Sequence, residues 1–197
     1  PSAGRLWWNG ESAERFGRAD WRHCRRQVQY VFQDAQSALN PRHRLGQIME
    51  APLRGLLGLP RPERTRRADA LLERVGLAPS LRRRYPHQLS GGQAQRLVLA
   101  RALAVEPLGL ILDEPVSALD VSIQAQILTL LKELRAELGL SYLFISHDLA
   151  VVEQLCEEVV VMQRGRVVER GSREQVFRKP EADYTRRLIR AAPRLPG

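Results

Sequence analysis

The spacing of apolar residues changes along the chain, and each spacing predicts a different kind of element. Apolar residues that alternate or run together over a few positions predict strands at residues 5–10, 28–32, 108–112, 143–145, 159–162 and 166–169. Apolar residues that recur every three or four positions predict helices within residues 41–86 and at residues 97–104, 121–138 and 149–156. Strands that alternate with helices in this way predict a mostly parallel sheet with covering helices.

Two carboxylates follow one of these runs. Residues 108–112 form a continuous apolar stretch of strand length, typical of a parallel strand buried on both faces. Asp113 and Glu114 come directly after it, at the carboxyl end of the predicted sheet, where ligands bind in open α/β folds. Adjacent residues at a strand end point apart, so one carboxylate can hold Mg²⁺ through water while the other reaches a second water molecule.

A small polar segment, Ser90-Gly91-Gly92-Gln93, stands just before the helix predicted at residues 97–104. Ser90 can cap that helix, and the glycines let backbone N–H groups approach an anion because no Cβ stands in the way. The segment therefore has two interpretations. It is either a phosphate site at a helix N-terminus or the ordinary capped start of a helix.

The composition of the chain limits its partners. The 197 residues carry a formal net charge of +9, which ordinarily suggests nucleic acid or an anionic lipid surface. Only two of the 31 basic residues are lysines, and the arginines are scattered in short clusters, as codon use in a GC-rich genome would produce. We therefore expect no nucleic-acid partner. No run of 18 apolar residues occurs, so we expect no direct membrane insertion.

Four short motifs follow one another at intervals of about one structural element. They are Leu89-Ser90-Gly91-Gly92-Gln93, Leu110-Ile111-Leu112-Asp113-Glu114-Pro115, Ser117-Ala118-Leu119-Asp120 and Ile145-Ser146-His147-Asp148. In this order they resemble the ATP-binding cassette (ABC) ATPases of transporters. The resemblance implies an α/β fold of the P-loop NTPase type, with a mostly parallel sheet, covering helices and an α-helical subdomain that carries the signature segment. It also implies ATP and Mg²⁺ as ligands.

The resemblance gives roles to residues at the strand ends. Asp113 is expected to hold Mg²⁺ and Glu114 to polarise the attacking water. His147 is expected to contact the γ-phosphate, and its range between neutral and charged forms suits a sensor that bonds the phosphate or Glu114. Gln33 resembles the family's glutamine that contacts Mg²⁺ and relays the nucleotide state to a membrane partner. The alternative for Gln33 is a surface loop residue.

The other motifs are implied to act between two subunits. In the family, the segment equivalent to Ser90, Gly91, Gly92 and Gln93 faces the ATP held by the other subunit of a head-to-tail dimer. Asp120 ends a loop that crosses the same interface, and it can equally be the N-cap of the next helix. A sister ATPase subunit, identical or different, and transmembrane permease subunits are therefore the expected partners.

One motif of the family is absent from this sequence. The phosphate-binding loop, G-x-x-x-x-G-K-[ST], needs a lysine that reaches the β- and γ-phosphates. The only lysines here are Lys132 and Lys179, both after the carboxylate pair, and the chain begins with Pro1 rather than methionine. The simplest expectation is a sequence that begins inside a longer protein. A protein that truly lacks the loop is the alternative.

The resemblance also suggests a division of the chain into four parts. Residues 1–40 are expected to be a remnant of an N-terminal strand region with the Gln33 loop, and residues 41–105 the helical subdomain with the signature. Residues 106–170 are expected to form the α/β ATPase core, and residues 171–197 a C-terminal helical tail.

Longer segments are similar to the ATPases of oligopeptide, dipeptide and nickel importers. These segments are Val31–Asp34, Ser37–Arg42, Tyr85–Gln88 and Asp113–Gln126. The chain departs from that group in three places. It has no phosphate-binding loop or adenine-stacking aromatic residue upstream, it has Ala35 where the group usually has proline, and it has no cysteine cluster in its C-terminal tail.

Two functions follow from the resemblance. The first is an ATPase subunit that couples ATP hydrolysis to the import of peptides or a related solute, bound peripherally at the cytoplasmic face of the inner membrane. The second is a catalytically silent module that completes a partner's ATP site in trans through Ser90–Gln93. Because it lacks the phosphate-binding loop, the chain as given is expected to be inactive alone.

Overall fold

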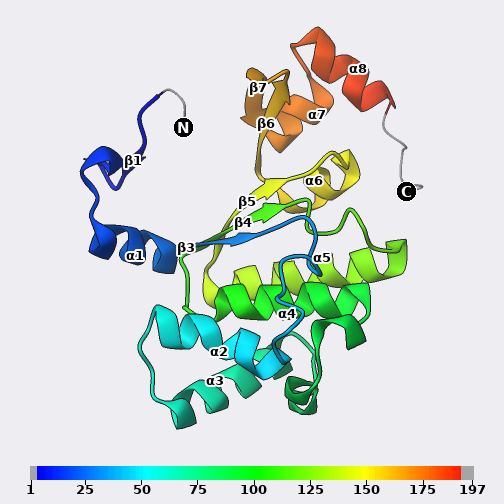
Figure 1. Cartoon of the computed structure of the whole chain (residues 1–197). Coiled ribbons are helices and arrows are strands. Elements are labelled where there is room, and N and C mark those ends of the chain that lie inside the picture. The colour runs from blue at the N-terminus through cyan, green and yellow to red at the C-terminus, as the bar shows by residue number, and fades with distance from the viewer. Residues whose placement is uncertain (1–3, 192–197) are drawn as a thin grey trace.

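The computed structural model describes residues 4–191, and three parallel strands form its centre (Figure 1). These strands are β3 (Val28–Val31), β4 (Gly109–Asp113) and β5 (Ser141–Ile145), hydrogen-bonded in that order. Val28 lies opposite Gly109, which in turn lies opposite Ser141. The predicted parallel sheet is therefore confirmed, and the carboxyl ends of all three strands lie at one edge.

Two long helices cover one face of this sheet. Figure 1 shows α4 (Gly91–Leu103) and α5 (Val121–Leu138) side by side beneath the strands. The main core lies between these layers, and Leu97, Leu112 and Leu131 are completely buried in it. Full burial of such a side chain contributes about 1.5–3 kcal/mol. Gly139 ends α5 in the left-handed conformation with φ of 64°, as glycine commonly does after a helix.

Two further helices form a lobe below α4 (Figure 1). They are α2 (Leu45–Gly55) and α3 (Arg61–Arg74), followed by the 3₁₀ turns η2 (Pro79–Arg83) and η3 (Pro86–Gln88). The side chain of Glu50 joins three parts of this lobe. Its carboxylate accepts hydrogen bonds from Arg82 Nη2 at 2.6 Å, Arg64 Nε at 3.3 Å and Thr65 Oγ1 at 3.2 Å.

The N-terminal part is a hairpin and a helix that lead into β3. The strands β1 (Trp7–Trp8) and β2 (Glu11–Ser12) pair antiparallel across Asn9 and Gly10, whose φ angles are 49° and 84°. Two positive φ angles are those of a type I′ turn, which Asn-Gly favours. The turn η1 (Ala13–Arg15) and helix α1 (Arg18–Gln27) follow.

The C-terminal part has its own small core. It contains α6 (Leu149–Leu155), β6 (Glu158–Gln163), β7 (Arg166–Ser172), α7 (Arg173–Arg178) and α8 (Asp183–Ala191). The core is made by Val152, Val159, Val161 and Val176. Strands β6 and β7 pair antiparallel, so the alternation of strands and helices does not extend the parallel sheet to this part.

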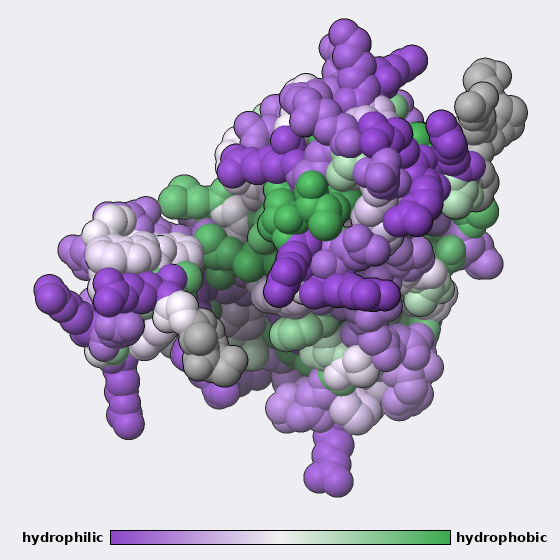
Figure 2. Space-filling model, turned by 90° about the horizontal axis from the view of Figure 1, so that it is seen from above, coloured by the Kyte–Doolittle hydropathy of each residue, from purple (hydrophilic) through white to green (hydrophobic). Residues whose placement is uncertain are grey.

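The second face of the central sheet differs from the prediction. Residues 108–112 were expected to be buried on both faces. Gly109, Leu110 and Leu112 are buried, but Ile111 is half-buried and Leu108 is 66% exposed. The face opposite α4 and α5 also exposes Tyr30, Phe32, Leu143 and Ile145. The reason is that α4 and α5 cover one face only. Figure 2, which views the molecule from above, shows apolar surface in its middle.

Within residues 4–191, none of the helices is both long enough and apolar enough to cross a membrane. The four-part division of the chain stays a prediction. Its last boundary, between residues 170 and 171, falls within β7 (Arg166–Ser172).

Candidate functional site

Glu114 lies where the ends of three strands meet. Gln33 follows β3, Glu114 follows β4, and His147 follows β5. Gln33 Nε2 donates to Glu114 Oε2 at 2.7 Å, and His147 Nδ1 lies 2.9 Å from Glu114 Oε1. Both oxygens of this carboxylate are therefore held, each by a residue from a neighbouring strand. The structure thus brings together three of the residues that the sequence pointed to.

The backbone of Glu114 has a conformation that is uncommon for a residue with a side chain. Its φ is 45°, in the left-handed region. Such a conformation costs about 1–3 kcal/mol and persists only where the surroundings hold it. Here the Glu114 N–H donates to the Ile145 carbonyl at 2.9 Å, and the Glu114 carbonyl accepts from Ser117 N at 3.3 Å and Ser117 Oγ at 3.1 Å. These bonds fix the direction in which the carboxylate leaves the chain.

The contact with Glu114 changes the acid–base behaviour of His147. The hydrogen bond from the ring, and then the negative charge of Glu114, raise the pKa of His147 above its ordinary value. The imidazole is 71% exposed, whereas the side chain of Glu114 is 23% exposed. The ring can therefore exchange protons with solvent while the carboxylate beneath it stays shielded.

Asp113 has a different partner from its neighbour. Its Oδ2 accepts a hydrogen bond from the Tyr30 hydroxyl at 2.6 Å. This bond raises the pKa of Tyr30, so the hydroxyl keeps its proton and remains a donor. Adjacent residues at the end of β4 thus use different sets of neighbours, as alternation along a strand requires.

The signature segment begins α4 as a closed capping box. Ser90 Oγ accepts from Gln93 N at 3.3 Å, and Gln93 Oε1 accepts from Ser90 N at 3.1 Å. Among the hydrogen bonds of residues 4–191, none uses the amide of Gly91 or Gly92. These two N–H groups remain at a helix N-terminus, where the macrodipole favours an anion.

Gly92 also has a structural reason to be glycine. A Cβ at this position would lie 2.6 Å from Ile123 Cγ2, and one at Gly91 would lie 3.3 Å from Leu119 Cδ2. Close packing against the start of α5 therefore demands a missing side chain at Gly92, whatever binds nearby. The signature segment contacts this region rather than Glu114, so the chain's own strand-end residues and its signature form two separate groups.

Asp120 occupies the N-cap position of α5 but does not use its side chain there. Its φ and ψ are −60° and 150°, the extended values of an N-cap, and its side chain makes no capping hydrogen bond. The carbonyl of Asp120 accepts from Gln124 N at 2.8 Å. The carboxylate is exposed and available to another molecule.

The strand-end residues suit a metal ion that arrives with phosphates. In the part of the chain that the structure describes, no three His, Cys, Asp or Glu residues cluster in a way that could hold a metal by themselves. Magnesium is usually bound through one or two carboxylates together with substrate phosphates and water. Asp113, with Oδ1 left beside its hydrogen-bonded Oδ2, and the Gln33 amide fit that pattern.

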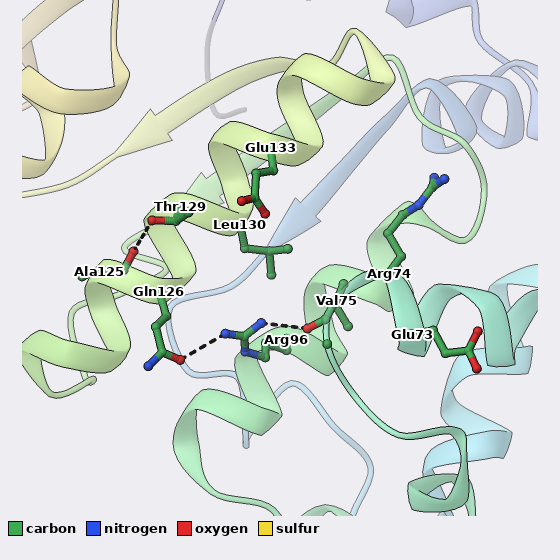
Figure 3. A pocket seen from close by; sticks show the side chains of 10 residues that line it. Glu73, Arg74, Val75, Arg96, Ala125, Gln126, Thr129, Leu130 and Glu133 are labelled. Carbon is green, nitrogen blue, oxygen red and sulfur yellow. Dashed lines mark hydrogen bonds between the residues drawn. The ribbon is translucent and has the colours of Figure 1, made fainter.

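A separate pocket lies between the lobe and α5. It has a volume of about 500 Å³ and is open and partly polar (Figure 3). Arg96 spans it, donating from Nη1 to the Val75 carbonyl at 2.8 Å and from Nη2 to Gln126 Oε1 at 3.2 Å. None of the predicted site residues lines this pocket.

Tyr30 and Ile123 were not predicted from the sequence to belong to a site. Tyr30 stands in an apolar strand and becomes notable only when the register with β4 places it near Asp113. Ile123 lies in the predicted helix, but its contact with Gly92 depends on how two helices cross.

Comparisons with known proteins agree on the family. The family model described as ABC transporter matches residues 1–117. The dipeptide transport ATP-binding protein DppF of Escherichia coli (strain K12) is 46% identical over 195 residues, covering 99% of this chain and 58% of that protein. The chain thus spans little more than half the length of this curated relative.

Solved structures agree with this match. One is cbiO1 from Clostridium perfringens, described as part of the ABC transporter complex cbiONQ. It matches with a TM-score of 0.77 and 33% sequence identity, and the match covers 91% of this chain and 70% of cbiO1. Another is the ATP-binding cassette MJ0796, a dimer bound to ADP and Pi, with a TM-score of 0.75 and 28% identity over 87% of this chain and 74% of that one. From its matching residues and its fold, the chain belongs to the ABC transporter family, whose ATPases bind nucleotides.

Proposed function

We propose that this chain carries the water-activating half of an ATP-hydrolysing site and acts in an ATPase subunit that drives solute import. The single observation that supports this most is the held carboxylate of Glu114, with Gln33 on one oxygen and His147 on the other. A carboxylate fixed in this way has a defined direction in which it can accept a hydrogen bond from water. Orienting a water molecule is the main task of such a residue in phosphoryl transfer.

Each of the three residues has a distinct role in this proposal. Glu114 orients the water that attacks the γ-phosphorus of ATP and accepts the proton that this water loses, while the bond from that phosphorus to the bridging oxygen of ADP breaks. His147 shares its proton between Glu114 and the phosphate, for which its exposed ring and raised pKa are suited. Gln33 releases or holds Glu114 according to whether its amide is engaged elsewhere. Bound Mg²⁺ would neutralise phosphate charge, and Asp113 and Gln33 are the residues that would hold it.

The signature segment has a role in a second, neighbouring site. The free amides of Gly91 and Gly92 stand at the start of α4 and away from Glu114 on the same chain. We propose that Ser90–Gln93 and Asp120 complete the ATP site of a sister subunit. The dimer of MJ0796 with ADP and Pi supports association of two such chains.

The solute and the membrane partners are inferred from relatives. DppF is named a dipeptide transport ATP-binding protein, and a relative from Brucella abortus (strain 2308) is named a putative peptide import ATP-binding protein. We therefore propose peptides or a related solute as the cargo and transmembrane permease subunits as partners. The chain would then lie at the cytoplasmic face of the inner membrane, attached through the permease.

A catalytically silent module is the competing proposal. It would keep the signature segment for a partner's site and hold no nucleotide of its own. A silent module would not require the left-handed backbone of Glu114 or the two contacts that hold its carboxylate oxygens. The intact strand-end geometry therefore favours the hydrolytic function.

Glu114→Gln in the gene product that carries this sequence tests the proposal. We expect ATP binding to persist while turnover falls about 100-fold or more, the scale of a lost general base. Glu106→Gln is a matched control, because Glu106 also has a left-handed backbone, with φ of 52°, and lies outside the strand-end group. Near-normal turnover in Glu114→Gln, or an equal loss in both variants, would refute the assignment.

A further inference from the structure

Tyr30 lies on the open face of the central sheet, one diagonal step from Asp113. Tyr30 pairs with Ile111 across β3 and β4, and Asp113 is two residues further along the same face. A diagonal neighbour on a sheet is within reach of a long aromatic side chain. The hydroxyl spans this gap and donates to Asp113 Oδ2 at 2.6 Å.

The ring of Tyr30 is held in this direction by Phe32. The two ring centroids are 4.5 Å apart with an angle of 41° between the planes. Phenylalanine in place of Tyr30 would keep this aromatic contact, so the contact does not explain the hydroxyl. Its only hydrogen bond among the described residues is the one to Asp113. Hydrogen bonds to a charged carboxylate are short and roughly twice as strong as neutral ones.

We propose that Tyr30 is a positioning residue that fixes the Asp113 carboxylate for a divalent cation bound together with nucleotide. With Oδ2 engaged by the hydroxyl, the carboxylate loses rotational freedom, and Oδ1 is the oxygen that remains for the cation. This inference rests on the proposed function, because it takes Asp113 as a cation ligand. Removing a residue that orients a metal ligand typically lowers metal affinity by about 10–100-fold.

Cation affinity, rather than turnover, is the measurement that tests this role. Mn²⁺ binding is followed by the EPR signal of free Mn²⁺, with the gene product that carries this sequence saturated with the non-hydrolysable analogue AMP-PNP. For Tyr30→Phe we expect Mn²⁺ affinity to fall about 10-fold, whereas AMP-PNP affinity measured in EDTA stays unchanged. A purely structural role for the hydroxyl would instead lower stability and leave Mn²⁺ affinity intact.

Two further variants separate the possible outcomes. Tyr142→Phe removes a hydroxyl that donates to the Leu131 carbonyl at 3.0 Å on the opposite face of the sheet, and should leave Mn²⁺ affinity unchanged. Asp113→Asn should weaken Mn²⁺ binding strongly. If Asp113→Asn weakens binding and Tyr30→Phe leaves it unchanged or tighter, the positioning role is overturned while the proposed function stands. If the unaltered protein binds neither AMP-PNP nor Mn²⁺, the proposed function fails, and this inference fails with it.

Discussion

Gly92 provides the sharpest test of how the signature segment is packed. It is the second residue of α4, and a Cβ there would lie 2.6 Å from Ile123 Cγ2. Isoleucine in a helix strongly prefers one χ1 rotamer, so this methyl group cannot easily turn away. A Cβ at Gly91 would instead meet Leu119 Cδ2 at 3.3 Å, the far end of a more flexible side chain. The two adjacent glycines should therefore respond differently to the same substitution.

Two opposing effects set the size of the response. Replacing glycine by alanine within a helix gains about 0.5–1 kcal/mol through backbone entropy, and this gain is smaller in the first turn. Forcing an extra methyl group into a packed contact costs about 1–3 kcal/mol. We expect Gly92→Ala to lower the free energy of unfolding by roughly 1–2 kcal/mol, and Gly91→Ala to change it by less than about 0.5 kcal/mol.

Urea denaturation of single and double variants measures this contact directly. Ile123→Ala removes Cγ2 and should recover much of the loss in Gly92→Ala, which appears as a coupling free energy between the two sites. Ile123→Val keeps Cγ2 and should recover little. If Gly92→Ala is as stable as the unaltered chain, or if Ile123→Ala and Ile123→Val give the same coupling, the packing argument is refuted.

Two other predictions concern the strand-end site and the lobe. In an NMR titration, His147 should have a pKa above about 6.5, and this pKa should fall back in Glu114→Gln. The contact stabilises the fold fully below about pH 6.5, and this contribution is lost as the pH rises through the raised pKa of His147. An unshifted pKa would contradict the contact. Glu50→Ala should lower the free energy of unfolding by about 2 kcal/mol, less than for a fully buried pair because Glu50 and Arg82 are 19% and 22% exposed. Glu63, whose side chain is 28% exposed and pairs with Arg66 and Arg67 of its own helix, serves as its control. An equal melting temperature for Glu50→Ala and Glu63→Ala would count against this role.

Most elements of the fold could be predicted from sequence because their signals are local. The helix from Val121 to Leu138 begins and ends where its apolar period and Gly139 indicate. The residues that follow β3, β4 and β5 were also predicted to follow strands. That Gln33 and His147 both reach Glu114 depends on the order of the three strands, which no local pattern encodes.

Two features of the fold needed information that the sequence pattern does not contain. An apolar run such as residues 108–112 predicts a buried strand, but it does not indicate whether other elements cover one or both faces of that strand. The antiparallel pairing of β6 and β7 depends on Arg164 and Gly165, whose φ angles of 49° and 76° form a tight hairpin turn. Arg-Gly is a weaker turn signal than Asn-Gly, so the sequence indicated a turn without the pairing.

The motifs of this chain differ in how far stability alone explains them. At the signature segment, capping explains Ser90 and Gln93, and close packing explains Gly92, so this geometry by itself does not require a ligand. Glu114 is different, because its left-handed backbone costs about 1–3 kcal/mol and a glycine there would remove that cost. With this backbone conformation, the Glu114 carboxylate lies between Gln33 and His147, which come from the two neighbouring strands. Stability does not explain a residue that has this backbone and whose side chain is held at both oxygens, and the proposed role in ATP hydrolysis rests on this feature of Glu114.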